Sequence, residues 1–194
     1  MNPDRLEHLG LLFSFLFSLV LSALLQLEHL SRYTLPVPDD LLRRLEAFSP
    51  WARSLVGFSD DVWLAPMAPG KWSVAECLAH LYLWDRFALT SRLPLLNQDA
   101  RLPLAPTAQS MNNFAANYAR TSANQEVLIE QFSSTRLELV TALRDWPPER
   151  WQVTFLIGKE IMTPRAYLEE FLNHNDHHRG QIERFWKSLL SGVD

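Results

Sequence analysis

The segment from Thr163 to about Leu190 repeats apolar residues at the spacing of an amphipathic helix, and histidines interrupt its buried face. Thr163 supplies an N-cap, and Pro164 is a favourable first helical residue. The inward-facing positions follow in steps of three or four residues: Tyr167, Phe171, His174, His178, Ile182, Phe185 and Leu189. Burying an imidazole is costly unless both of its nitrogens find partners. Two consecutive histidine positions on a buried face therefore indicate metal ligation, in which one ring nitrogen binds the ion and the other donates a hydrogen bond.

Three further stretches carry the same helical spacing, and together with this segment they predict four helices. The first covers about 39–55, with a kink at Pro50 or a restart capped by Ser49. The second begins at a capping box formed by Ser73 and Glu76. The third, roughly 110–145, is either one helix or a broken pair. Four consecutive helices without internal repeats predict an all-α fold, an antiparallel four-helix bundle.

The segments between these helices contain turn and cap residues. Residues 57–71 and 94–108 are rich in proline or glycine and predict loops. Ser122 and Gln125 form a second capping box inside the third helical stretch. Residues 151–162, an alternating run followed by Gly158-Lys159 and Glu160-Ile161-Met162, predict either a small β-hairpin or an extended loop.

Residues 9–27 contain no charged side chain, and a run of this length is about what a helix needs to span a bilayer. The flanking charges show no excess of Lys or Arg on one side. Three interpretations follow, of which we favour the first: a membrane anchor or uncleaved signal, a helix that packs on the domain or on a second subunit, or a mis-assigned start with translation beginning near Val37. We therefore expect an apolar N-terminal helix over 1–35 and a cytoplasmic bundle domain over 36–194, tethered to the membrane if the first helix inserts.

Composition excludes several classes of protein. The net charge of −4 offers no basic face for a nucleic acid. The single cysteine, Cys77, rules out an intrachain disulfide, and we interpret it as a small buried apolar residue. A chain of 194 residues has room for one sizeable core.

A third histidine, His80, lies on the edge of the apolar face of the second helix and is a candidate ligand beside His174 and His178. Taken alone, a buried histidine is more often a hydrogen-bonded core residue, so the pair on the last helix carries the argument. Glu76 and Asp85 lie four and five residues from His80 along the same helix, where either could orient a ligand.

Two motifs in the chain resemble those of DinB-like (YfiT-type) proteins. Residues 71–81, KWSVAECLAHL, resemble the family pattern W-S-x-x-E-x-x-x-H-L. Residues 174–182, HNDHHRGQI, resemble its closing pattern H-x-x-H-H-R-G-Q. The resemblance covers roughly residues 38–190, and the two motifs together are more specific than either alone.

This resemblance implies an antiparallel four-helix bundle, often a homodimer, from a bacterial family. It also implies one divalent metal ion on three histidines, which by motif position are His80, His174 and His178. The family includes transferases and isomerases that use the low-molecular-weight thiols bacillithiol or mycothiol, and other members are described as metal-dependent hydrolases. Zinc or nickel is the expected ion, with iron or manganese as alternatives.

Three neutral histidines leave coordination positions open, as in catalytic metal sites. A divalent ion in such a site lowers the pKa of a bound water or thiol. The first hypothesis is therefore an enzyme that activates a low-molecular-weight thiol or water against a small electrophile, with Asp85, Glu76 or His177 handling protons. The second is a bundle that binds metal or a small molecule without turnover, and the third is a membrane-tethered interaction module.

The small-molecule substrate is not identified by the segment between residues 94 and 120. Asn112, Asn113, Asn117 and Tyr118 could line the mouth of a polar pocket. We interpret them instead as covering a solvated face.

Overall fold

The computed structural model describes residues 38–121 and 124–191. The predicted apolar helix over 1–35, with its membrane anchor at 9–27, lies outside the described residues. In the part that is described, no helix has both the length and the apolar composition that crossing a membrane requires. The helices and strands are α2 (Asp39–Glu46), α3 (Phe48–Arg53), α4 (Asp60–Leu64), α5 (Val74–Phe87), β1 (Ala100–Leu102), α6 (Ala108–Thr121), α7 (Gln125–Arg144), β2 (Phe155–Ile157), β3 (Glu160–Met162) and α8 (Pro164–Ser191).

The first helical rod of the bundle consists of two short helices, because a proline interrupts it. Pro50 has no N–H to donate to the carbonyl of Glu46, so α2 ends at Glu46 and α3 restarts at Phe48. The two helices keep one buried face, made of Leu41, Leu42, Leu45, Phe48, Trp51 and Ala52. The predicted restart is confirmed, but α3 begins at Phe48 with Ala47 as its N-cap, so the predicted cap at Ser49 is wrong.

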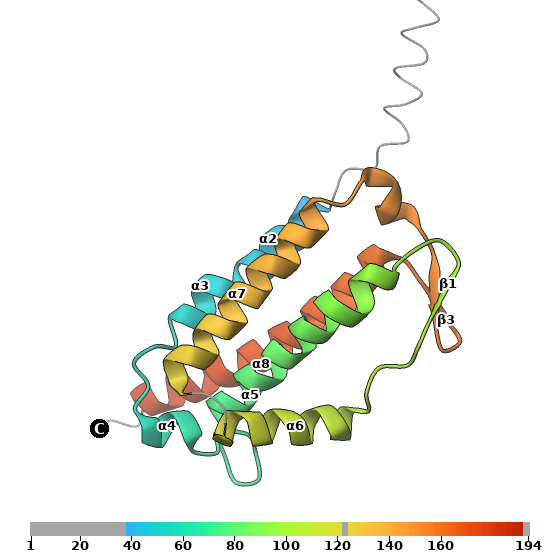
Figure 1. Cartoon of the computed structure of the whole chain (residues 1–194). Helices are drawn as coiled ribbons and strands as arrows, with labels where there is room; N and C mark the ends of the chain where they lie inside the picture. The colour runs from blue at the N-terminus through green and yellow to red at the C-terminus, as the bar shows by residue number, and fades with distance from the viewer. Residues whose placement is uncertain (1–37, 122–123, 192–194) are drawn as a thin grey trace, which may run out of the picture. The chain divides into compact units, whose positions relative to one another are not determined.

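Four rods form the bundle: α2 with α3, α5, α7 and α8 (Figure 1). Ion pairs along their surfaces fix their relative directions. Glu46 on α2 pairs with Arg144 at the end of α7, whereas Arg53 on α3 pairs with Glu130 near the start of α7. The first rod and α7 therefore run antiparallel.

The first rod and α8 run in the same direction. Asp40 at the start of α2 pairs with Arg165 at the start of α8, and Arg44 one turn later pairs with Asp176. Helix α5 packs on both α7 and α8 and runs antiparallel to α8. It follows that α5 and α7 run parallel (Figure 1).

The four-helix bundle is confirmed, but the expected antiparallel order is wrong for α5 and α7. These two rods are consecutive in the chain and point the same way, so the chain must return along the bundle between them. The return contains a π-helical turn over Ala88–Arg92, strand β1 and helix α6, which packs against α5. The predicted loop 94–108 forms part of this return, and the predicted stretch 110–145 is the broken pair α6 and α7.

A three-stranded sheet lies at one end of the bundle and corrects the strictly all-α expectation (Figure 1). Strand β2 pairs in parallel with β1, with Phe155 opposite Ala100, and antiparallel with β3, with Phe155 opposite Met162. Gly158 adopts φ +63° in the turn between β2 and β3, a conformation that glycine enters at little cost. The hairpin interpretation of residues 151–162 is confirmed for 155–162, and the preceding residues Pro148–Gln152 form a 3-10 helix instead. Strand β1 falls in a segment predicted to be a loop.

Candidate metal centre

Three histidines from two antiparallel helices meet inside the bundle. His80 lies on α5 and is 4% exposed, because α6, α7 and α8 all pack on that helix. His174 and His178 lie one turn apart on α8. One ring nitrogen of each histidine lies within 4.8 Å of the other two, and the Nε2 atoms of His80 and His174 are 3.0 Å apart. Two nitrogens bound to one tetrahedral zinc ion at about 2.0–2.1 Å would lie about 3.3 Å apart, so the spacing fits such an ion.

Gln181 orients one of these rings. His178 Nδ1 lies 3.0 Å from Gln181 Oε1 and donates its hydrogen there, which leaves His178 Nε2 unprotonated. The amide of Gln181 then donates to His177 Nε2, also at 3.0 Å. This is the support that metal-binding histidines usually receive from a neighbouring acceptor. His80 lacks it, since its Nδ1 is buried without a hydrogen-bond partner in the described part of the chain.

Burial keeps the three rings neutral, which is the form that binds metal. It lowers the pKa of His80 to about 3, with further lowering from the charges that His178 and His174 would carry. Burial likewise lowers the pKa of His174 to about 4, and it lowers the pKa of His178. At neutral pH the cluster therefore presents three neutral imidazoles, each with one unprotonated ring nitrogen.

Two tryptophans enclose the histidines with apolar surface. The ring of Trp72 lies nearly parallel to that of His178, at an interplanar angle of 9° and a centroid distance of 5.8 Å, and it also contacts His80. The ring of Trp84 meets His80 and His174 edge-on. Such walls lower the local dielectric constant and strengthen electrostatic interactions inside the site.

A buried ion pair engages the carboxylate of Asp85, so this group is not available for proton transfer. Both carboxylate oxygens accept hydrogen bonds from Arg136, at 2.7 and 2.8 Å, and neither side chain is exposed. Arg136 also donates to Asn175 Oδ1, so the pair ties α5 and α7 to the residue that follows His174. Burial raises the pKa of Asp85 to about 6, against the opposing effect of the Arg136 charge. Asp85 thus holds the helices that carry the histidines.

Glu76 lies in the first turn of α5, whereas His177 is exposed on α8. Glu76 completes the predicted capping box by accepting from the backbone N–H of Ser73, and its other oxygen pairs with Arg120. Its carboxylate therefore caps α5. His177 is exposed, and it reaches the histidine cluster through the amide of Gln181. Of the three residues predicted to handle protons, only His177 is connected by hydrogen bonds to a clustered histidine.

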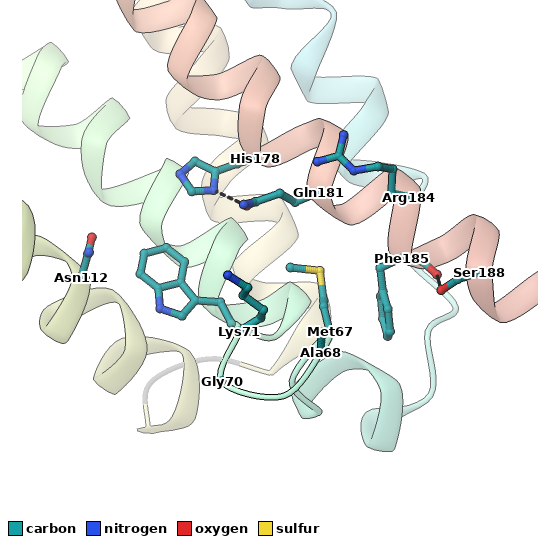
Figure 2. Close-up of a pocket in the computed structure, with 11 residues that line it drawn as sticks. Met67, Ala68, Gly70, Lys71, Asn112, His178, Gln181, Arg184, Phe185 and Ser188 are labelled. Atoms are coloured by element: carbon teal, nitrogen blue, oxygen red, sulfur yellow. Dashed lines mark hydrogen bonds between the residues drawn. The ribbon is translucent and has the colours of Figure 1, made fainter.

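A cavity of about 630 Å³ opens beside His178, within the size range of small-molecule sites (Figure 2). Its walls come from the loop before α5, from α6 and from α8. They include Met67, Lys71, Trp72, Asn112, Gln181, Arg184 and Phe185. Asn112, which we interpreted as part of a solvated face, instead contributes to this wall.

The DinB superfamily model matches residues 37–182, well over half of the chain. The chain belongs to the DinB superfamily. A solved structure with the same fold is that of YfiT from Bacillus subtilis, described as a probable metal-dependent hydrolase with an unusual four-helix bundle topology. The two share 18% sequence identity at a TM-score of 0.59, over 78% of this chain and 86% of that one. No match is found among curated proteins.

In this DinB superfamily protein, the sequence located the histidines better than it located their surroundings. Gln181 stands in the closing motif, yet its contact with His178 depends on side-chain direction along α8 and was not predicted. Lys71 and Arg184 are ordinary exposed basic residues in the sequence, and only the fold brings them to one cavity. Arg184 could have been predicted from its position, because a charged residue one or two helical turns from a predicted ligand can reach the same site.

Proposed function

We propose that this protein is an enzyme in which His80, His174 and His178 hold one divalent metal ion that activates a low-molecular-weight thiol or water against a small electrophile. The observation that carries this proposal is the convergence of three neutral imidazoles beside a cavity large enough for a small molecule. A bound divalent ion would lower the pKa of the bound thiol or water and would polarise an electrophilic group. Zinc and nickel suit imidazole ligands best, with iron or manganese as alternatives.

The protein's own groups would perform three tasks. His178 would present Nε2 to the ion, because Gln181 fixes its tautomer. Trp72 and Trp84 would exclude bulk water from the rings. His177 would exchange protons with solvent beside the site, because it is exposed and bonded to Gln181.

The engagement of both nearby carboxylates favours a thiol over water as the nucleophile. Glu76 caps α5 and Asp85 is paired with Arg136, so neither is placed to remove a proton from water. A thiol ionises far more readily, with an ordinary pKa of about 8.5 against about 15.7 for water. A nucleophile that needs little help from a base therefore fits this site better.

The same observation supports a second candidate function. A site without a free carboxylate base would also suit a protein that binds metal or a small molecule without turnover. The two candidates differ in one measurable respect, because only an enzyme consumes its electrophile in proportion to time.

The test combines metal content with turnover on the full chain, purified without a histidine tag. We expect about one divalent ion per chain by elemental analysis, lost in a His174→Ala/His178→Ala double variant. The matched control is His177→Ala, which removes a neighbouring imidazole outside the cluster and should keep the ion. Consumption of a chlorodinitrobenzene electrophile with N-acetylcysteine should require the ion and fail in the double variant.

Three other results would contradict the proposed enzyme. Turnover that persists in the double variant would exclude catalysis at the histidines. A wild-type protein that holds the ion but consumes neither thiol nor ester electrophiles would support the binding function. A wild-type protein that refuses zinc, nickel, iron and manganese would make the histidines polar core residues.

A further inference from the structure

We propose that the cavity beside His178 selects small anions, a carboxylate or phosphate on an apolar body, through Lys71 and Arg184. This inference deepens the proposed function and rests on it, because the anion would occupy the cavity that adjoins the metal centre. The charge of the cavity wall supports this proposal. Among the residues that the structure describes, Lys71 and Arg184 are the charged side chains of the cavity wall, and no Asp or Glu lines it.

This charge is opposite in sign to that of the whole chain. The chain carries 22 acidic and 18 basic residues, yet the charged side chains that the described part of the chain contributes to the cavity wall are both basic. No ion pair to Lys71 or Arg184 occurs within residues 38–121 and 124–191, whereas the neighbouring Arg179 pairs with Glu183. Both cations therefore remain available to a ligand. A cavity lined by one sign of charge concentrates ligands of the other sign.

Gly180 leaves open space beside the guanidinium of Arg184. Gly180 lies in the middle of α8, where glycine costs about 0.5–1 kcal/mol relative to alanine. Its backbone is ordinary for a helix, so no turn requires it there. A Cβ atom added at Gly180 would lie 3.1 Å from Arg184 Nη1. The missing side chain thus gives the guanidinium room to lie back along α8, one turn from Gln181.

The two cations approach the cavity from different elements. Lys71 comes from the loop before α5, and Arg184 comes from α8 beside His178 and Gln181 (Figure 2). The remaining wall includes the apolar side chains of Met67 and Phe185 and the ring of Trp72. A ligand that satisfies all of these groups carries an anionic end and an apolar body.

The experiment measures binding by titration calorimetry with three matched probes: 4-phenylbutyrate, phenyl phosphate and the neutral 4-phenylbutyramide. Each is titrated into the full chain in zinc-loaded form and after treatment with a chelator. We expect both anions to bind at least about tenfold more tightly than the amide, in both forms of the protein. The relative affinity of the two anions shows whether a carboxylate or a phosphate is preferred.

Substitutions then assign the anion to its site. A Lys71→Gln/Arg184→Gln variant should lose about tenfold in anion affinity and keep its metal content. The matched control is Lys187→Gln, which removes a charge from α8 on the side that lines a separate groove with Trp186.

Two results would overturn the inference. The first is an amide that binds as tightly as the anions. The second is anion binding confined to the zinc-loaded protein and unchanged in the Lys71/Arg184 variant, because the metal alone would then hold the anion. A protein that takes up no metal yet prefers anions would contradict the proposed function and support this inference, so the two failures are distinguishable.

Discussion

Gln181 decides which nitrogen of His178 is free, and a single substitution tests this role. Gln181→Met removes the acceptor for His178 Nδ1–H while keeping a side chain of similar length. We expect metal affinity to fall about 10- to 100-fold, as for other residues that support a metal-binding histidine. Competition with a chromophoric chelator measures the change.

The matched variant is Gln181→Glu. It keeps an oxygen acceptor for His178, replaces the donor to His177 and adds a negative charge beside both rings, so its affinity should stay closer to that of the wild type. An equal loss in both variants would show that the amide serves His177 rather than His178. Circular dichroism on both variants checks that α8 is intact.

At this scale the sequence predicted the residues better than their roles. His80, His174 and His178 follow from helical spacing and from the two motifs, since both depend on position along the chain. The ion pair that engages Asp85 with Arg136 could not be predicted, because the two residues are 51 positions apart and the choice of partner depends on the fold. For the same reason, the sequence did not predict that Lys71 and Arg184 line one cavity.

At the scale of helices, the Asp85–Arg136 pair is a fully buried ionic link between α5 and α7. The guanidinium is also enclosed by the rings of Phe48, Phe132 and Phe171, at 4.9, 5.0 and 5.6 Å. Arg136→Met should lower the free energy of unfolding by about 3–5 kcal/mol, because it leaves a buried carboxylate without its partner. Urea denaturation measures the loss.

Two further variants make this prediction specific. The exposed pair of Arg53 and Glu130 is the control, and Arg53→Met should cost no more than about 1 kcal/mol. The double variant Asp85→Leu/Arg136→Met should recover much of the loss, because no charge is left buried. A double variant as unstable as Arg136→Met would show that packing around Arg136, rather than its charge, supports the helices.

Local signals predicted the helix ends, and non-local contacts decided their directions. The capping box at Ser73 and Glu76 is present because it depends on four consecutive residues. Asn124 is the N-cap of α7, and its side chain accepts a hydrogen bond from the backbone N–H of Val127. The second predicted capping box required Gln125 three residues after the cap, but Gln125 is the first residue of α7, and Ser122 lies outside the described residues. Helix direction, by contrast, is set by packing partners, so the parallel course of α5 and α7 was missed.

For the whole molecule, the depressed histidine pKa values predict how stability without metal depends on pH. His80 and His174 bind protons in the unfolded chain near their ordinary value of 6.5, but in the folded chain only near 3 and 4. Between these limits the unfolded state binds more protons, so the free energy of unfolding falls as the pH falls from 6.5. Above 6.5 these two residues contribute no pH dependence.

Denaturation of chelator-treated protein at a series of pH values measures this slope. Asp85 acts in the opposite sense between about 6 and 3.8, so it offsets part of the effect of the two imidazoles. A His174→Gln variant should show a shallower fall over the range from 6.5 to 4, because one titrating group is gone. The same slope in both proteins would mean that His174 is protonated in the folded state.

Cys77 gives the molecule a built-in reporter of its own opening. The thiol is fully buried on α5, one turn before His80, and burial raises its pKa to about 12. An alkylating reagent can reach it only after α5 separates from its neighbours. The labelling rate of this single cysteine in native buffer therefore counts opening events, and zinc held between α5 and α8 should slow it. The protein that we expect to activate foreign thiols would thus reveal metal binding through the protection of its own.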